Sequence, residues 1–336
     1  MDRRVVVGGW YGGINVGDEL LLEQFVRWIR QCGAVPVVIS VNPAYTSKML
    51  DVHAIDRCDL AGVIESLGGA ALFVLGGGGL FQDYDRFDRQ SLESYPALNV
   101  SQFAQYFFAA RALGVATAVL AQGVGSLRAD DARNIVAEIF DTATFASVRD
   151  QTSADLLRSL GVTRTVAVAP DPVWSSPPPA SIDLVERAPH LSGLRVLGVN
   201  VRHWPYDGEW EAAFVAAMRS VALPGWACLW VDFSYAVAGG GDTRLVSIDN
   251  SPRLVPQIEG VHAHFHAHSP HDAEAALVSC DAVLAMRMHA VLVAHRSLLP
   301  AASIEYDDKV RTLDENLGVP DVQRVQLDTL GSLEFL

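Results

Sequence analysis

Short apolar segments with few charges alternate with amphipathic segments along the first half of the chain. The apolar segments cover residues 5–7, 35–39, 71–75, 116–121, 145–148 and 166–168, and helical patterns cover 19–32, 101–113, 129–140 and 153–160. Strands that are apolar without a break are buried on both faces, and helices provide the crossover connections that parallel strands need. The first half therefore predicts a parallel sheet covered by helices on both sides.

A proline-rich segment interrupts this alternation. Residues 177–179 are three consecutive prolines, which remove three backbone donors and fix three φ angles, so neither a sheet nor a helix accommodates them. The alternation then restarts, with apolar segments at 195–201, 227–233, 282–285 and 299–304 and helical patterns at 210–220, 273–278 and from residue 289. We expect an α/β protein of two Rossmann-like domains, residues 1–175 and 194–336, with a linker at 176–193 and a ligand-binding cleft between the domains.

Charge and cysteine usage narrow the function classes. The chain has 25 Lys and Arg against 39 Asp and Glu, a net charge of −14. This balance argues against a protein that binds nucleic acid along its phosphates, although a local group of cations can still bind a small anion. The four cysteines are far apart in the sequence, which argues against a zinc–cysteine site or a disulfide framework and fits a reducing compartment.

Targeting and membrane signals are absent from the sequence. The apolar run at residues 5–7 stops at two glycines, which is too short for a secretory signal. No window approaches about 18 consecutive apolar residues, the length that a membrane-spanning helix needs. We therefore expect a cytoplasmic protein without a transmembrane segment.

Glycine-rich segments follow strands of the first half and indicate a neutral, hydroxyl-rich ligand. They are GGWYGGINVGDE at 8–19 and GGGGLFQD at 76–83, while QGVG at 122–125 equally fits a plain strand-to-helix turn. Glycines let a ligand approach the backbone closely, and the first segment lacks both the dinucleotide fingerprint and the Walker lysine. Acidic groups at a helix start repel phosphate but suit sugar hydroxyls; a helix cap is the alternative role of Asp18. The candidate sugar-binding residues are Asn15, Asp18, Glu19, Gly77, Gly78, Gln82 and Asp83.

Cationic side chains follow strands of the second half. Arg202 follows the strand at 195–201, Arg287 and His289 follow 282–285, and Lys309 follows 299–304. Arginine suits carboxylate or phosphate, and a histidine beside it can transfer a proton near neutral pH. Arg287 and His289 are two positions apart and share a side if this stretch is extended. The alternative roles are a surface salt bridge for Arg202, a structural histidine and a solvated lysine.

Histidines alternate at 262, 264, 266 and 268, with another at 271. On a strand, such a period places side chains on one face, where they can hold a metal. No cysteine or carboxylate stands at zinc spacing, so we expect a polar strand or loop and no metal. The role of this histidine stretch stays open, and residues 238–243 have the composition of a flexible loop.

Taken together, the motifs resemble the polysaccharide pyruvyl transferase family and occur in family order along nearly the whole chain. The matching segments are GWYGGINVGDE at 9–19, GGGLFQD at 77–83, QGVG at 122–125, VRDQTSADLLRSLGV at 148–162, DPV at 171–173, VNVR at 199–202, MRMHA at 286–290 and YDDKV at 306–310. Met288 stands where the family commonly has leucine, a change that conserves volume, and Asp308 stands where proline is frequent.

The resemblance implies a two-domain glycosyltransferase-B-like fold. It also implies transfer of the enolpyruvyl unit of phosphoenolpyruvate onto two hydroxyls of one sugar, which forms a cyclic ketal and releases phosphate. Family members act on cell-wall or capsular polysaccharide, often on lipid-linked precursors, which would bring the protein to the inner face of the membrane. No metal and no organic cofactor are implied.

The residue chemistry fits this donor. Arg202, Arg287 and Lys309 provide three positive charges for a carboxylate and a phosphate. We expect His289 to transfer a proton, a contribution of about 10²–10⁴ in rate, and Arg287 to stabilise the departing phosphate. The glycine-rich segments of the N-terminal domain would hold the neutral sugar acceptor.

Two other functions fit the same expected fold. A glycosyltransferase that uses a nucleotide sugar shares the architecture, because fold does not determine function; it would ordinarily need an acidic residue for the ribose in the second domain. A non-catalytic carbohydrate-binding protein would keep the glycine-rich segments without needing Arg202, Arg287, His289 and Lys309 together.

Overall fold

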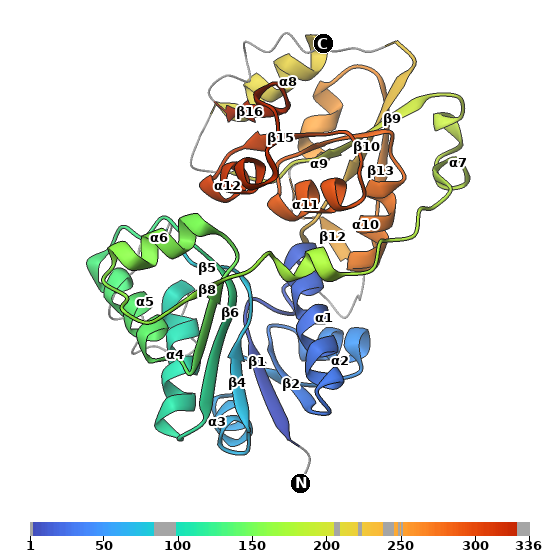
Figure 1. Ribbon diagram of the computed structural model, residues 1–336. Coiled ribbons are helices and arrows are strands. Elements are labelled where there is room, and N and C mark those ends of the chain that lie inside the picture. Colours follow the sequence, from blue (N-terminus) through green and yellow to red (C-terminus); the bar gives the residue numbers. More distant parts are fainter. Residues whose placement is uncertain are drawn as a thin grey trace. The chain divides into compact units, whose positions relative to one another are not determined.

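The protein consists of two compact units, each built on its own parallel sheet (Figure 1). The computed structural model describes residues 3–83, 99–204, 209–220, 224–237, 245–247, 249 and 251–327. The N-terminal unit comprises Met1–Gly13 and Asp18–Ser176, and the C-terminal unit comprises Ile14–Gly17 and Pro177–Leu336. The short segment Ile14–Gly17 thus packs with the second unit although it precedes most of the first in the sequence.

Parallel strands form the sheet of the N-terminal unit. The strands are β1 (Arg4–Gly8), β2 (Val35–Ser40), β3 (His53–Asp56), β4 (Leu72–Leu75), β5 (Gly78–Phe81), β6 (Ala116–Val124), β7 (Phe145–Val148) and β8 (Ala167–Val168). Their order is β3-β2-β1-β4-β6-β7-β8, with β5 also paired to β6. Since β2 and β4 both pair with β1, the strand order reverses between β1 and β4, as in a doubly wound sheet.

Helices cover both faces of this sheet. They are α1 (Val16–Gln31), α2 (Pro43–Leu50), α3 (Leu60–Gly68), α4 (Asn99–Ala112), α5 (Asp130–Thr142) and α6 (Gln151–Ser159), followed by the 3-10 turn η2 (Pro172–Ser175). In Figure 1, α1 and α2 lie on one face and α4 and α5 on the other. One buried apolar cluster joins the strands to α3, α4 and α5, with fully buried Phe73, Phe107 and Phe140 in it. Burial of this surface, worth about 25 cal/mol per Å², is the main source of the unit's stability.

The C-terminal unit repeats the same strand pattern. Its strands are β9 (Arg195–Asn200), β10 (Trp226–Val231), β13 (Val261–Phe265), β14 (Ala282–Ala285), β15 (Ala301–Glu305) and β16 (Arg324–Gln326). They are parallel in the order β13-β10-β9-β14-β15-β16, so here the order reverses between β9 and β14. A separate antiparallel pair is formed by β11 (Tyr235–Val237) and β12 (Leu245–Ser247).

Helices of the C-terminal unit connect these strands. They are α7 (Leu184–Arg187), α8 (Trp210–Ser220), α9 (Ser251–Leu254), α10 (Pro270–Val278), α11 (Met288–Arg296) and α12 (Asp308–Leu317), with 3-10 turns η3 (Pro189–Leu191), η4 (Val255–Gln257) and η5 (Asp321–Gln323). Figure 1 shows α10, α11 and α12 beside the sheet. Within the described part of the chain, no helix combines the length and the apolar character needed to cross a bilayer.

The predicted α/β class with two Rossmann-like units is confirmed, and most predicted elements are present with ends that differ by a few residues. Two local predictions were wrong. Residues 76–83, expected as a loop, contain strand β5, because their backbone pairs with β6. Residues 122–124 belong to β6 itself rather than to a turn after it. Elements that were not predicted include β3, α2, α3 and α12. The loop expected at 238–243 lies outside the described residues.

Candidate functional site

In each unit, the motifs of the sequence follow the two strands between which the strand order reverses. The glycine-rich segments follow β1 and β4 in the N-terminal unit. In the C-terminal unit, Arg202 follows β9, while Arg287 and His289 follow β14. Open α/β sheets bind ligands at the carboxyl ends of strands where the order reverses, because the connections diverge there and leave backbone N–H groups accessible. Each unit therefore has one candidate ligand site.

In the N-terminal unit, Glu19 holds the first glycine-rich segment in place. Its Oε1 accepts a hydrogen bond from the Gly12 backbone N–H at 2.9 Å, and the Glu19 side chain is buried. Gly12 has φ +74°, and a Cβ there would lie 2.1 Å from the Ser40 hydroxyl. The glycine is thus required both by conformation and by space, and Glu19 has a structural task whether or not it also meets a ligand.

Asp18 lies against the second glycine-rich segment. A Cβ at Gly78 would lie 3.1 Å from Asp18 Oδ1, and Gly78 has φ +120°. At Gly77, a Cβ would lie 2.9 Å from the Ala121 carbonyl oxygen. The predicted acceptor residues Asp18, Gly77 and Gly78 are therefore neighbours. Buried Tyr11 lies beside them, and burial together with the charges of Asp18, Glu19 and Asp171 raises the pKa of its phenol.

Asp83 binds the backbone just before helix α5. Its Oδ2 accepts hydrogen bonds from the Arg128 and Ala129 backbone N–H groups, both at 2.6 Å, immediately before α5 begins. A carboxylate at this place also interacts favourably with the helix dipole. Gln82 is half-buried and its Oε1 would lie 3.9 Å from a Cβ at Gly79. Acceptor binding by Gln82 and Asp83 stays a prediction.

Asn15 lies in the C-terminal unit although it was expected on the acceptor side. Its side-chain oxygen accepts the Gly17 N–H at 3.2 Å, at the start of α1, and its backbone forms a β-bridge with Ser234. Two backbone hydrogen bonds flank this bridge, from Val16 N–H to the Phe233 carbonyl at 2.9 Å and from Tyr235 N–H to the Ile14 carbonyl at 3.1 Å.

His289 packs directly against the glycine of this segment. A Cβ at Gly17 would lie 2.0 Å from His289 Nδ1 and 2.5 Å from its Cγ. Any side chain larger than hydrogen at residue 17 therefore displaces the imidazole. His289 is half-buried in the first turn of α11, where the backbone N–H groups and the helix dipole favour an anion.

Tyr306 joins two of the predicted cations. Its hydroxyl accepts a hydrogen bond from Arg202 Nη1 at 3.1 Å. The Arg202 guanidinium lies 5.2 Å from the centre of the Tyr306 ring and Lys309 Nζ lies 5.3 Å from it, both within the range of a cation–π interaction. Trp204 packs edge-on against the same ring at 4.7 Å. The structure thus brings Arg202 and Lys309 together around one phenol.

Three cations act on the Tyr306 phenol. Burial by itself would raise the pKa of the Tyr306 phenol, but Lys309, Arg202 and Arg287 outweigh this effect and lower the pKa below its ordinary value. A phenol whose pKa is lowered despite burial marks a place that stabilises negative charge. The same place therefore suits an anionic ligand.

We expected Arg287 and His289 to share a side if this stretch were extended. It is not extended, so they do not. Arg287 precedes the first residue of α11 and His289 lies inside the first turn, because the chain turns into a helix directly after β14. The Arg287 guanidinium is paired with Asp249: Nε lies 3.1 Å from Oδ1 and 3.3 Å from Oδ2, and Nη2 also donates to Oδ1. The Arg287 backbone N–H is bound by the Asn200 side chain at 3.2 Å.

Two histidines of this stretch, His262 and His264, lie in the edge strand β13, and the others follow it. The rings of His264 and His266 stack at 6.5 Å, and Trp230 Nε1–H donates to His262 Nδ1 at 3.1 Å. Burial and the two neighbouring histidines lower the pKa of His264. Among the described residues, no group of three or more His, Cys, Asp or Glu side chains is arranged to hold a metal ion.

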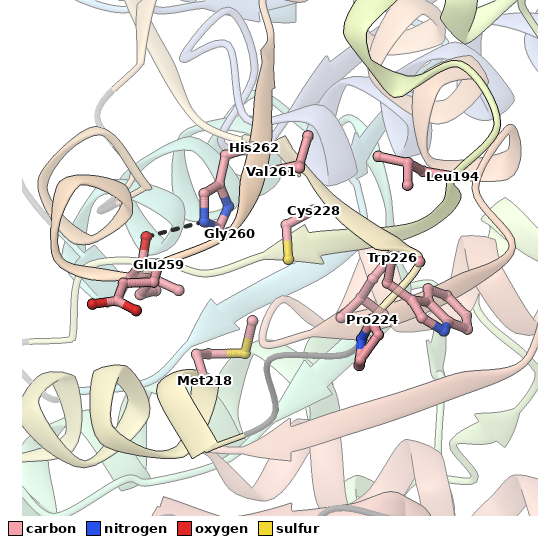
Figure 2. A pocket seen from close by; sticks show the side chains of 12 residues that line it. Leu194, Met218, Pro224, Trp226, Cys228, Glu259, Gly260, Val261 and His262 are labelled. Carbon is pink, nitrogen blue, oxygen red and sulfur yellow. Dashed lines mark hydrogen bonds between the residues drawn. The ribbon is translucent and has the colours of Figure 1, made fainter.

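A mostly apolar pocket of about 320 Å³ lies at the amino ends of β9, β10 and β13 (Figure 2). Trp226, Cys228 and Met218 contribute to its lining, and at one side His262 Nε2 lies 3.1 Å from the Ile258 carbonyl oxygen. Burial raises the pKa of the Cys228 thiol to about 11, so this cysteine is a poor nucleophile near neutral pH. The pocket is at the opposite ends of the strands from Arg202 and Arg287.

A comparison with family models identifies the chain. The model of the family "Polysaccharide pyruvyl transferase" matches residues 15–308. The chain belongs to this family. The resemblance seen in the sequence motifs is thereby confirmed, and with it the expectation that the protein is a transferase of polysaccharide biosynthesis. A search of curated proteins finds no match.

Solved structures show where the fold of this pyruvyl transferase family member recurs. S. aureus MnaA, solved with UDP, has a TM-score of 0.63 at 9% identity, over 99% of this chain and 87% of that one. The HepE protein of Anabaena in complex with UDP-glucose has a TM-score of 0.57 at 13% identity, over 98% and 97%. A protein from Listeria monocytogenes described as a UDP-N-acetylglucosamine 2-epimerase has a TM-score of 0.62 at 8% identity, over 99% of this chain and 86% of that one. At these identities the likeness establishes the glycosyltransferase-B-like fold alone.

Two site residues were not selected from the sequence. Tyr306 stands in the family-like segment YDDKV, and an aromatic residue directly after a strand and three positions before a lysine was an available signal. Asp249 follows β12 in a segment without any recognisable pattern, and only the tertiary contacts with Arg287 reveal it.

Proposed function

We propose that this protein transfers the enolpyruvyl group of phosphoenolpyruvate onto two hydroxyls of a sugar in a cell-wall or capsular polysaccharide, or in its lipid-linked precursor. The products are a pyruvate ketal and phosphate. The C-terminal unit binds the donor through Arg202, Arg287, His289 and Lys309. The N-terminal unit supplies the acceptor-binding groups, chiefly Asp18, Gly77 and Gly78.

One observation carries the proposal: Arg202 and Lys309 both contact Tyr306, directly after the strands β9 and β15 that flank β14. Arg287 and His289 follow β14 between them. Four groups that suit an anion are thus gathered at the place where a doubly wound sheet binds its ligand, on a chain whose net charge is −14. Phosphoenolpyruvate offers a carboxylate and a phosphate to this group.

The chemistry can be written with these residues. His289 delivers a proton to the terminal enol carbon, which becomes a methyl group, and positive charge develops on the neighbouring carbon. One sugar hydroxyl adds to that carbon and loses its proton, which restores His289. The second hydroxyl adds as the bond to phosphate breaks, and its proton leaves with the phosphate. Arg202 and Lys309 stabilise the negative charge on the departing group, and general acid–base catalysis contributes about 10²–10⁴ in rate.

The proposed acceptor site of the N-terminal unit has acidic side chains, although the sugar that it would bind is uncharged. Asp18 lies beside Gly78 with its carboxylate oxygen against the glycine backbone, where it can accept hydrogen bonds from sugar hydroxyls. A carboxylate here disfavours a second anionic ligand. This supports placing the uncharged sugar in the N-terminal unit and the anionic donor in the C-terminal unit.

A nucleotide-sugar glycosyltransferase is the alternative on this fold. Its ribose would need a carboxylate near the carboxyl ends of the C-terminal sheet. Three carboxylates there are engaged: Asp249 binds Arg287, Glu305 accepts from Arg324 Nε at 2.6 Å, and Asp307 accepts the Lys309 N–H at 2.9 Å. These contacts favour phosphoenolpyruvate as the donor.

Phosphate release tests the proposal. The purified protein is incubated with phosphoenolpyruvate and candidate acceptor glycans, and UDP-sugars replace the donor in a parallel series. We expect acceptor-dependent phosphate release with phosphoenolpyruvate only. Arg202→Ala should raise the KM for phosphoenolpyruvate about 10-fold to 100-fold, because it removes a charge-assisted hydrogen bond. Arg195→Ala, at the amino end of the strand β9 that precedes Arg202, is the matched control. Turnover of UDP-sugars without phosphoenolpyruvate would refute the proposal.

A further inference from the structure

Asp249 is a buried carboxylate that no sequence pattern pointed to. Its side chain is fully buried, and both of its oxygens receive hydrogen bonds from the Arg287 guanidinium. Two backbone N–H groups also donate to Oδ2, from Phe233 at 2.7 Å and from Ser234 at 3.1 Å. A buried carboxylate with this many donors holds them rigidly, because each lost bond would leave a buried charge without compensation.

Phe233 and Ser234, which donate to Asp249, also bind the segment Ile14–Gly17 that packs against His289. The Phe233 carbonyl accepts the Val16 N–H at 2.9 Å, and Ser234 forms the β-bridge with Asn15. Gly17 follows in this segment and packs against the imidazole of His289. Asp249 therefore binds Arg287 directly. It is linked to His289 through three successive contacts: from Asp249 to the Phe233–Ser234 backbone, from there to residues 15–16, and from Gly17 to the imidazole.

The pairing also limits what Arg287 can do. A guanidinium bound by a buried carboxylate attracts an anion less than an unpaired one, because the carboxylate offsets part of its charge. Net attraction for a doubly anionic ligand then comes mainly from Arg202 and Lys309, which contact Tyr306. The value of Arg287 lies in its fixed direction, since a preorganised donor stabilises a transition state without reorganising.

We propose that Asp249 is a positioning residue, which fixes the Arg287 guanidinium and, through the Phe233–Ser234 backbone, the segment that seats His289. The proposal rests on the proposed function insofar as these two side chains act on phosphoenolpyruvate. Its physical content, the fixing of Arg287, can be measured without any turnover.

The first experiment observes the Arg287 side chain by NMR in Asp249→Asn and in the wild type. The wild-type Arg287 Nε–H should give a resolved, slowly exchanging signal, assigned by its loss in Arg287→Lys. In Asp249→Asn this signal should exchange at least 10-fold faster, because the ionic acceptor is gone. An Arg287 signal with unchanged exchange in Asp249→Asn overturns the proposal.

The second experiment separates kcat from the KM for phosphoenolpyruvate in the same variants. Asp249→Asn should lower kcat about 10-fold to 100-fold, the size of effect that a misplaced catalytic group produces. The KM should stay within threefold of wild type, because Arg202 and Lys309 are intact. A kcat within twofold of wild type, or a KM that rises as much as kcat falls, overturns the proposal.

Glu274→Gln is the matched control. Glu274 is also a buried carboxylate of the C-terminal unit and accepts a hydrogen bond from Arg296 Nη2 at 2.5 Å. Losing this pair should destabilise the fold without changing kcat or the Arg287 signal. If the wild type neither binds nor turns over phosphoenolpyruvate, the proposed function is refuted, while the NMR comparison still decides whether Asp249 fixes Arg287.

Discussion

The two units have the same strand order but opposite chemistry where that order reverses. After β1 and β4, the N-terminal unit places glycines and the carboxylates of Asp18 and Glu19. After β9 and β14, the C-terminal unit places Arg202, Arg287 and His289, with Lys309 added after β15. Under the proposed function, the topology defines where each ligand binds, and the side chains define which ligand it is.

The comparison also shows how each unit neutralises its buried carboxylates. In the N-terminal unit, Glu19 and Asp83 accept hydrogen bonds from backbone N–H groups. In the C-terminal unit, Asp249 accepts from backbone N–H groups and from Arg287 as well. Backbone donors stabilise Glu19 and Asp83 without adding a cation, whereas Asp249 also fixes the direction of Arg287. Asp171 of the N-terminal unit follows the second pattern, because its carboxylate pairs with Arg149 at 3.3 Å.

The largest effect should come from His289→Ala. Removing the proton-transferring group of the C-terminal site should lower kcat for phosphate release by about 10²–10⁴, while phosphoenolpyruvate binding, followed by calorimetry, should persist. His295→Ala on the same helix α11 is the control, since it changes a histidine near the opposite end of the helix. Unchanged turnover in His289→Ala would remove the proposed division of roles between the units.

A smaller loss is expected from Gly17→Ala, which tests whether the segment Ile14–Gly17 serves the C-terminal site. The new Cβ would lie 2.0 Å from His289 Nδ1, so the imidazole must move, and kcat should fall about 10-fold to 100-fold. Alanine favours a helix over glycine by about 1 kcal/mol, so a weakened α1 would not explain the loss. The measurement is kcat together with the melting temperature.

Gly68→Ala is the matched control for this substitution. Gly68 is the last residue of α3, and a Cβ there meets no atom within 4 Å. We expect unchanged kcat and a gain in stability of about 0.5–1 kcal/mol. If Gly17→Ala behaved like Gly68→Ala, the contact between Gly17 and His289 would have no role in turnover.

Asp314 contrasts with the carboxylates that backbone N–H groups bind. It is fully buried, and its carboxylate accepts a hydrogen bond from the Ser303 hydroxyl. Burial raises the pKa of Asp314 from 3.8 to about 6. The folded state then holds the proton more tightly than the unfolded state, so stability from this group is present below about pH 4 and is lost as the pH rises to 6.

Asp314→Asn should remove this loss. The free energy of unfolding of the variant, relative to wild type, should increase between pH 4 and pH 6 and then level off, with a gain of about 1–3 kcal/mol at pH 7. Urea unfolding at several pH values measures it. A difference between variant and wild type that does not depend on pH would show that the carboxyl is not buried as a neutral group.

The smallest effect is expected for Asp83→Ala, which asks whether this acceptor-side carboxylate is structural. Loss of the two hydrogen bonds before α5 should lower the free energy of unfolding by about 1–2 kcal/mol. Urea unfolding provides the measurement. A raised KM for the acceptor glycan at unchanged stability would instead assign Asp83 to ligand binding.

Much of the fold could be predicted because burial leaves a local signature. Strand β7 at Phe145–Val148 and helix α8 at Trp210–Ser220 coincide with their predicted ranges, since an uninterrupted apolar run and a helical repeat are each visible within a few residues. Strand β5 was not predicted, because Gly78 and Gly79 have low strand propensity. Strand β5 forms because the neighbouring strand β6 pairs with it, and its own sequence does not indicate this pairing.

The site was partly predictable for the same reason. Residues that follow a buried strand lie at the carboxyl edge of a parallel sheet, so Arg202, Arg287, His289 and Lys309 could be grouped from their places in the sequence alone. The partners of these side chains could not be predicted. Asp249 is 38 positions from Arg287, and nothing in the intervening sequence indicates that their side chains meet.

The amino-acid sequence alone determined the fold class and the family, because these depend on local apolar patterns and on which residues follow which strands. Only the tertiary structure decided that Ile14–Gly17 packs with the C-terminal unit, that Gly17 makes room for His289, and that Asp249 binds Arg287. Contacts between residues far apart in sequence follow from how whole elements pack, and packing is a property of the complete fold rather than of any one segment.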